Sequence, residues 1–298
     1  MAKRAVKYAV IDAFTDTPFK GNPAAVCFLE EEDEGGVDEQ WMQSVAKEFN
    51  ISQTAFLTRT TTSSSRFNLR WFTPVAEVKL CGHGTIAAAH FLYTSGIAKG
   101  DMIEFVSKSG VLTATKVQDC GKSDTSKPCN AKADEGFSIE LNFPIVSVVE
   151  CDSMEIPSIP KTLNGLSMVK VQKTATNGDL IVELASGEDV ASIQPNFDEL
   201  EKCPGRGIII TGPAPTGSEF DFISRFFCPK FGINEDPVCG SAHCALAPYW
   251  GKKLGKQSLI AYMASPRGGR LDLEVEEETR RVRIRGPAVT VMVGTLLV

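Results

Sequence analysis

Residues 81–89 have the sequence CGHGTIAAA, and residues 239–247 have the sequence CGSAHCALA. Both begin with Cys-Gly and continue into an apolar, alanine-rich run, which predicts a buried helix that starts at the cysteine. An F-x-P sequence precedes each of them, Phe72-Thr73-Pro74 in the first half and Phe227-Cys228-Pro229 in the second. The chain therefore contains the same local pattern twice, and we expect a pseudo-symmetric pocket with one thiol on each side.

Around these two helices the chain is rich in strand patterns. In the first half, strands are predicted over residues 6–14, 24–29, 54–58, 66–72, 102–107 and 111–117. In the second half, they are predicted over 137–143, 167–184, 206–211, 221–227, 258–264, 271–276, 281–285 and 288–297. Helical periodicity occurs elsewhere over 38–49 and 188–201. Because no regular βαβ order appears, the sequence predicts an α+β fold of curved, mostly antiparallel sheets wrapped on central helices.

The length of 298 residues favours two lobes, because it is long for a single hydrophobic core. A Lys-, Ser- and Asp-rich stretch without apolar pattern, residues 121–134, is the predicted linker. We therefore expect a first lobe over residues 1–120 and a second over 135–285.

Composition limits the partners and the compartment. The net charge of −6 argues against nucleic acid and anionic membrane as partners. No apolar run is long enough to span a bilayer, and no signal-peptide core follows the basic residues Lys3, Arg4 and Lys7. The nine cysteines are an odd number without C-x-x-C pairs, which indicates free thiols in a reducing compartment. We expect a cytoplasmic protein.

Only Cys81 and Cys239 have surroundings that suggest chemistry. At the start of a helix, the dipole and the free amides favour a thiolate and bind anions. Isomerisation next to a carboxylate needs two groups on opposite sides of the carbon, one deprotonated and one protonated. Amides near Gly82, Gly84 and Gly240 could hold the carboxylate, since glycine lets a substrate approach the backbone closely.

Segments spread along the chain resemble one family, the phenazine-biosynthesis PhzF-like proteins. The segments that carry the resemblance are Asp12-Ala13-Phe14-Thr15, Phe19-Lys20-Gly21-Asn22-Pro23-Ala24, Ser52-Gln53-Thr54-Ala55-Phe56, Trp71-Phe72-Thr73-Pro74, Cys81-Gly82-His83-Gly84, Glu235-Asp236-Pro237-Val238-Cys239-Gly240-Ser241-Ala242, Arg267-Gly268-Gly269 and Arg285-Gly286. The resemblance implies the diaminopimelate epimerase fold, with two similar lobes and a site in the cleft. It allows the last strand, about 286–298, to cross back to the first lobe. It implies an enzyme without cofactor or metal that acts on a small carboxylate, and it leaves a homodimer open.

The resemblance also implies roles for individual residues. The acid/base and substrate-contacting positions of the PhzF enzymes correspond here to His83, Asp236 and Ser241, and Asn22 lies in a matching segment. At the position of the family's acidic residue this chain has Gln53, whose amide cannot donate and recover a proton near neutral pH. We therefore do not expect the proton shuttle of the PhzF enzymes in this chain, and we expect Gln53 to contact the substrate instead.

A second difference lies at Cys239. PhzF-like proteins usually have threonine there, whereas the amino-acid epimerases have a cysteine in both loops. The presence of both Cys81 and Cys239 predicts a PhzF-like scaffold with an epimerase-like thiol pair, and with it an isomerase or epimerase.

Three other interpretations stay open. The cysteines could be small buried residues that cap their helices. Cys81, His83, Cys239 and His243 could form a metal site, although neither loop has a zinc-finger spacing. Because of Gln53, the chain could also be a catalytically silent protein that binds a metabolite or a protein.

Overall fold

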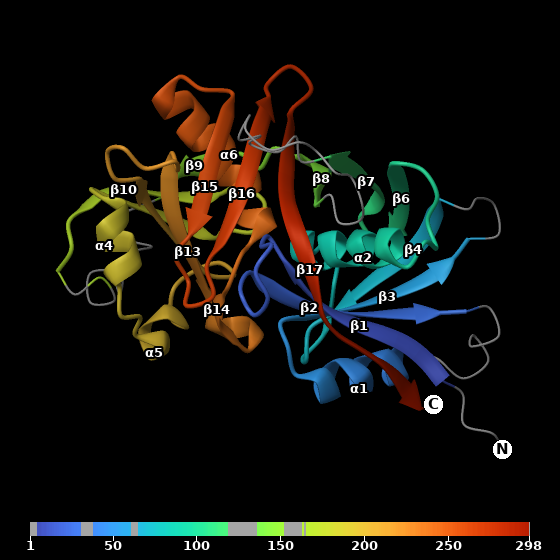
Figure 1. Cartoon of the computed structure of the whole chain (residues 1–298). Helices are drawn as coiled ribbons and strands as arrows, with labels where there is room; N and C mark the ends of the chain where they lie inside the picture. Colours follow the sequence, from blue (N-terminus) through green and yellow to red (C-terminus); the bar gives the residue numbers. More distant parts are fainter. Residues whose placement is uncertain are drawn as a thin grey trace.

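The structure, a computed structural model, describes residues 5–30, 38–60, 65–118, 136–151, 163 and 165–297. It has two lobes side by side, each built from a curved sheet around one central helix (Figure 1). The predicted α+β class is confirmed. Helices are few, and the strands form one continuous hydrogen-bonded sheet that passes through both lobes.

The first part of the chain contains β1 (Ala5–Ala13), β2 (Asn22–Leu29), α1 (Glu39–Phe49), β3 (Gln53–Arg59), β4 (Arg66–Phe72), β5 (Glu77–Val78), α2 (Gly82–Thr94), β6 (Met102–Ser107), β7 (Gly110–Gln118), β8 (Phe137–Pro144) and β9 (Val148–Glu150). The second part contains β10 (Met168–Thr174), β11 (Leu180–Leu184), α4 (Gly187–Ser192), α5 (Phe197–Leu200), β12 (Ile208–Pro213), β13 (Phe222–Cys228), a 3-10 turn (Pro229–Phe231), β14 (Ile233–Asp236), α6 (Gly240–Leu254), β15 (Ser258–Met263), β16 (Gly269–Glu276) and β17 (Arg281–Leu297).

The two lobes repeat the same order of strand pairings. In the first, β1–β2 is antiparallel, β2–β3 parallel, β3–β4 antiparallel, β4–β6 parallel and β6–β7 antiparallel. In the second, the same alternation runs through β10–β11, β11–β12, β12–β13, β13–β15 and β15–β16. The repeat noticed at the two cysteines therefore extends over both lobes.

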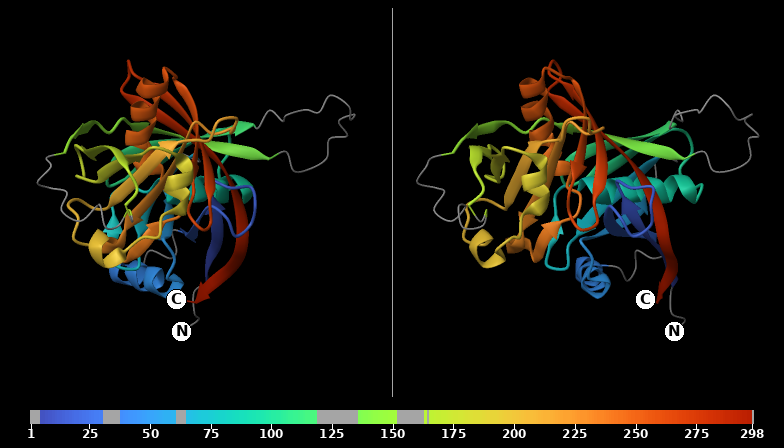
Figure 2. Two further views of the ribbon diagram at one scale, coloured as in Figure 1. Left: turned by 90° about the vertical axis from the view of Figure 1, so that its left-hand side faces the viewer. Right: turned by 60° about the vertical axis from the view of Figure 1, so that its left-hand side comes forward.

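Two segments pass from one lobe to the other. β8 pairs with β7, and the chain then continues into β9, which pairs with β10. β17 pairs with β16 over Arg281–Arg285, and its second half, Ala288–Leu297, pairs with β1. β8 and β17 also pair with each other where they cross. Each lobe thus completes its sheet with a strand that comes from the other, and Figure 2 shows β17 following the outside of the molecule down to the C-terminus.

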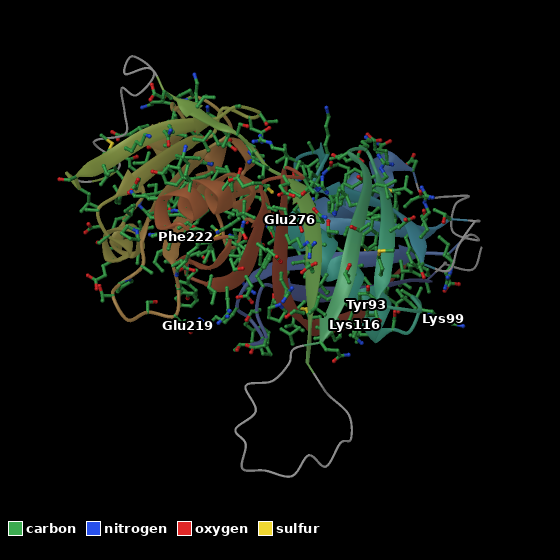
Figure 3. All side chains as sticks on the ribbon, turned by 90° about the horizontal axis from the view of Figure 1, so that it is seen from above. Tyr93, Lys99, Lys116, Glu219, Phe222 and Glu276 are labelled. Atoms are coloured by element: carbon green, nitrogen blue, oxygen red, sulfur yellow. The ribbon has the colours of Figure 1, made fainter. Side chains whose placement is uncertain are left out.

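The central helices α2 and α6 are buried because their sequences are apolar almost all round. Ten of the thirteen residues of α2 are buried, and many are alanines, which let the surrounding strands approach closely. Near the end of α2, Tyr93 packs edge-on against Phe137 of β8, with ring centres 5.9 Å apart. In the other lobe, Phe222 stacks on Trp250 of α6 at 5.5 Å. Figure 3 shows Tyr93 and Phe222 in separate lobes. No helix in the described ranges is long and apolar enough to span a bilayer.

Three predicted elements differ from the structure. The single helix expected over 188–201 is two short helices, because Pro195 interrupts the run and Asn196 begins a new helix. The strand expected over 167–184 is β10 and β11 joined by a turn. The strands expected over 281–285 and 288–297 are one strand, and Pro287 lies where β17 leaves β16 and begins to pair with β1.

The predicted linker, residues 121–134, lies outside the described residues, so the boundary between lobes at this point stays a prediction. β8, which follows it, is hydrogen-bonded to β7 over Phe137–Leu141. The last residue of β7, Gln118, pairs with the first residue of β8, Phe137.

Candidate active site

The N-termini of α2 and α6 meet at two glycines. A Cβ atom added to Gly82 would lie 3.4 Å from Gly240 Cα, and one added to Gly240 would lie 3.5 Å from Gly82 Cα. Cys81 is the N-cap residue of α2, and Cys239 is that of α6. The first amides of a helix have no carbonyl partner within the helix, so N–H donors of both helices are brought together here, and that of Gly84 is bonded to Cys81 Sγ at 3.4 Å. Such a place suits an anion.

One cleft of about 540 Å³ opens at this junction and is lined by residues of both lobes. Eight of the ten predicted site residues line it: Gln53, Cys81, Gly82, His83, Asp236, Cys239, Gly240 and Ser241. The other two lie behind its wall. Asn22 is fully buried. A Cβ on Gly84 would lie 2.9 Å from Trp71 Cδ1 and 3.2 Å from Gln53 Cγ, so the glycine is needed for packing.

His83 contacts the thiol of Cys81. Cys81 Sγ lies 3.5 Å from His83 Nδ1, and Ser52 Oγ lies 3.3 Å from His83 Nε2. The Ser52 hydroxyl donates its hydrogen to carbonyl oxygens, those of the Asn22 side chain at 2.8 Å and of Pro23 at 2.7 Å. It can therefore only accept from the ring, which assigns the histidine proton to Nε2.

Asn22 leaves Nδ1 of His83 free for the thiol. The Asn22 Nδ2 group lies 2.6 Å from Asp236 Oδ1, 2.9 Å from Val238 O and 3.1 Å from His83 Nδ1. An amide nitrogen has two hydrogens, and the two shorter contacts use both. The lone pair of Nδ1 is then available to accept the S–H proton of Cys81.

Neither thiol is ionised by its surroundings alone. Burial raises the pKa of Cys81, the Asp236 carboxylate raises it further, and hydrogen bonds from the backbone of Gly84 and His83 act in the opposite direction. Burial likewise raises the pKa of Cys239 well above its usual value. Burial lowers the pKa of His83, while Asp236 opposes this change. At neutral pH the site therefore holds two thiols and one neutral imidazole.

The setting of Cys239 differs from that of Cys81. Its sulfur lies 3.3 Å from the Ser241 hydroxyl, and no histidine ring contacts it within hydrogen-bonding distance among the described residues. Its backbone N–H points to the Met263 sulfur at 2.9 Å. The two halves of the cleft are thus chemically unequal, since only Cys81 has a neighbouring base.

Gln53 is buried at the cleft without a complete set of partners. It is 3% exposed, and its Nε2 has no hydrogen-bond partner in the described part of the chain. A buried amide donor without an acceptor costs about 1–3 kcal/mol. Because Gln53 lines the cleft, an acceptor on a bound ligand would remove this cost.

Sequence reasoning missed Arg206, which also lines the cleft. Arg206 precedes β12 and forms a bidentate ion pair with the buried Asp179, with Nη2 2.6 Å from Oδ2. The missed turn between β10 and β11 also contributes Thr176 and Asn177 to the lining. No motif surrounds these residues, and only the repeat of the lobes would have pointed to them.

The four candidate metal ligands do not converge. His243 donates through Nδ1 to the carbonyl of Cys239 at 2.8 Å, faces Ser224 with Nε2 at 3.5 Å and stacks on Phe222. It is therefore a buried core residue of α6. Across the ranges that the structure describes, no group of three or more His, Cys, Asp or Glu side chains is arranged to hold a metal ion.

Comparison with known proteins agrees with this architecture. A sequence model described as phenazine biosynthesis-like protein matches residues 11–294. An uncharacterized isomerase of Halalkalibacterium halodurans is 42% identical over 289 residues, which cover 97% of each chain. A crystal structure of a PhzF family protein of Enterococcus faecalis has a TM-score of 0.82 and 37% identity, covering 99% of this chain and all of that one.

A more distant structure shows the fold alone. The hydroxyproline epimerase of Agrobacterium vitis is 11% identical, covers 99% of this chain and 93% of its own, and has a TM-score of 0.56. The two-lobed, epimerase-like fold implied by the resemblance is thereby confirmed, as is the family. The chain belongs to the phenazine biosynthesis-like (PhzC-PhzF) family and is related to proteins that are named as isomerases.

Proposed function

We propose that this protein is a cofactor-independent isomerase or epimerase that moves a proton on a small carboxylate or amino-acid-like substrate in the cleft between its lobes. The observation that carries the proposal is the position of Cys81 and Cys239 at two abutting helix N-termini that line one cleft. The amides there that do not bond a cysteine sulfur would hold the substrate carboxylate and stabilise the charge that develops on it as the carbon loses its proton. Gln53 Nε2 would supply one more donor.

Proton removal would begin with Cys81 and His83. The thiol passes its proton to the free lone pair of His83 Nδ1, and the resulting imidazolium is stabilised by the charge of Asp236. The Cys81 thiolate then takes the proton from the substrate carbon and becomes a thiol again. Asn22 keeps Asp236 close to the ring throughout.

Proton return would come from Cys239. Because burial keeps this thiol protonated, it is suited to act as the acid on the other side of the carbon. After it donates, Cys239 is a thiolate and His83 is an imidazolium, so charge is conserved. Transfer of the histidine proton to the Cys239 sulfur through solvent restores the starting state. Ser241, 3.3 Å from that sulfur, stabilises the thiolate by hydrogen bonding.

The second candidate is a catalytically silent protein that binds a metabolite in the same cleft. The raised pKa values of both thiols and the amide of Gln53 in place of an acid favour it. Both candidates use the same residues for binding, and they differ only in whether the carbon-bound proton is exchanged.

Incubation in deuterated water separates the two candidates. Both enantiomers of a panel of amino acids and hydroxy acids are followed by NMR and mass spectrometry for deuterium at the α-carbon. An isomerase incorporates deuterium, and Cys81→Ser or Cys239→Ser lowers the rate of isomerisation by about 100-fold or more. Cys203→Ala, a buried cysteine of the second lobe outside the cleft, is the matched control. The absence of exchange with every panel member would leave the binding protein as the better account.

A further inference from the structure

The repeat of the two lobes includes one pair of positions whose chemistry differs. In the first lobe, Gly21 has a φ of +61° and is followed by the buried Asn22 at the start of β2. In the second, Gly178 has a φ of +67° and is followed by the buried Asp179 just before β11. Both strands then pair in parallel with the next one, so Asn22 and Asp179 occupy equivalent places.

Each of these residues is bound by a residue that leads into the next strand. Ser52, just before β3, donates to Asn22. Arg206, just before β12, donates to Asp179, with Nε 3.2 Å from both carboxylate oxygens and Nη2 2.6 Å from one of them. The first lobe thus uses a neutral pair where the second uses a charged one, and of these two pairs only the charged one places a cation in the wall of the cleft.

The guanidinium of Arg206 is held in place, but not all of its hydrogen-bond donors are used by the described residues. Asp179 occupies the edge formed by Nε and Nη2, and the ring of Phe226 packs against the group at 5.4 Å. Within the described ranges no residue accepts a hydrogen bond from Nη1. The side chain is 29% exposed, while that of Asp179 is 2% exposed. A planar guanidinium can bind one carboxylate along its side and a second across Nη1 and Nη2.

Arg206 belongs to the loop before β12 and not to the N-termini of α2 and α6, which would hold the carboxylate next to the reacting carbon. Its positive charge reaches Cys239, on which it acts electrostatically. Arg206 lines the cleft from the second lobe together with Thr176 and Asn177, which the turn before β11 contributes. The other charged groups lining the cleft are Asp236, which Asn22 binds, and the exposed Lys79. The cleft therefore offers a second, preorganised place for an anionic group.

We propose that the natural substrate is a dicarboxylate, one of whose carboxylates lies at the N-termini of α2 and α6 while the other binds Arg206. The substrate class rests on the proposed function of the same cleft. Arg206 is then a specificity-determining residue that contacts the substrate away from the reacting carbon. Asp179 is a positioning residue that fixes the guanidinium before the ligand arrives.

The test compares acids that differ only in the second carboxylate. Both enantiomers of aspartate, glutamate, 2-aminoadipate and 2-aminopimelate are titrated by calorimetry into the full chain beside the amide of each side-chain carboxyl. We expect at least one dicarboxylate to bind on the order of 10- to 100-fold more tightly than its amide, the range for a hydrogen-bonded charge pair. Arg206→Gln should abolish this preference and leave the affinity for the amide within about twofold.

Arg206→Gln also leaves the buried carboxylate of Asp179 without its cation, so this variant alone could fail to fold. The double variant Asp179→Asn/Arg206→Gln removes both charges and should fold and lose the preference. Arg206→Lys keeps the positive charge without the planar guanidinium and should lose most of the preference for dicarboxylates. Lys79→Gln removes the exposed cation of the same cleft and should keep the preference, which excludes a general effect of charge.

Two results would overturn the proposal: no dicarboxylate binding more tightly than its amide, or a preference that survives in the double variant. The outcome is independent of catalysis. A preference for dicarboxylates without deuterium exchange would contradict the isomerase and support the anion site. Deuterium exchange of monocarboxylates without any preference for dicarboxylates would support the isomerase and contradict the anion site.

Discussion

Asn22 Nδ2 donates a hydrogen bond to Asp236 Oδ1 at 2.6 Å, and this contact joins the first strand pair of one lobe to the cysteine loop of the other. The same amide nitrogen reaches the carbonyl of Val238 at 2.9 Å. Through these two bonds a fully buried residue fixes the carboxylate that acts electrostatically on Cys81, His83 and Cys239.

Asn22→Ala should lower the free energy of unfolding by about 1–3 kcal/mol, because two acceptors of the second lobe lose their buried donor. Urea denaturation at pH 7 measures the change. Asn68→Ala removes an amide that bonds Thr58 on the surface and should change stability by less than about 0.5 kcal/mol. Equal effects of the two substitutions would contradict the structural importance of the Asn22 contacts.

Gln53→Leu should raise stability in the absence of ligand, since it removes a buried amide whose Nε2 has no partner in the described chain. The expected gain is about 1 kcal/mol, measured by thermal and urea denaturation. Ligand binding should weaken at the same time, because the donor would be lost. A less stable variant with unchanged ligand affinity would show that Gln53 is a structural residue.

Asp236→Asn should make both cleft thiols more acidic, since the Asp236 charge raises the pKa of Cys81 and of Cys239. Alkylation by iodoacetamide, read by peptide mass spectrometry, should therefore be on the order of tenfold faster at pH 8 in the variant. Glu219→Gln changes an exposed carboxylate that is not part of the cleft lining and serves as the control. Alkylation at the wild-type rate would contradict the electrostatic role of Asp236.

Stability should fall as the pH is lowered from about 6.5 toward 4. Burial lowers the pKa of His90 and of His243 to about 4, whereas a histidine in the unfolded chain titrates near 6.5. Between these values the unfolded state binds protons that the folded state does not, so each residue costs on the order of 2–3 kcal/mol by pH 4.5. Urea denaturation at pH 7, 5.5 and 4.5 measures the slope.

The variant His90→Phe tests the origin of that slope. His90 stacks on Phe137, and its Nδ1 is buried without a partner among the described residues, so an aromatic ring without titration should fit there. The variant should lose less stability than the wild type between pH 7 and 4.5. Identical losses would assign the acid sensitivity to other groups.

Removal of residues 288–298 should prevent the first lobe from closing, because β17 supplies the partner of β1 over its whole length. We expect loss of cooperative unfolding, monitored by circular dichroism. Thr290→Ala, an exposed side chain on the same strand, keeps the backbone pairing and should unfold like the wild type. A truncated chain that still unfolds cooperatively would contradict this role.

The parts of the site that could be predicted are those in which local sequence and repetition agree. Cys81 and Cys239 stand out because a Cys-Gly pair and an alanine-rich run occur twice, and the structure places both at helix N-termini. Arg206 could not be predicted, because its importance depends on Asp179, a partner 27 residues away in sequence. Two strands are predicted in place of β17, because Pro287 interrupts the strand pattern. In the structure the strand continues and changes its partner from β16 to β1, which depends on the tertiary fold.

The exchange of strands between the lobes also has a consequence for synthesis on the ribosome. The first residues described, from Ala5, can pair with their neighbour β2 early, but their other edge waits for a strand that ends at Leu297. During translation this edge stays exposed until β17 has emerged, and exposed edges invite association with other chains. The nascent protein should therefore depend on chaperones until β17 is released, and its two lobes mature together.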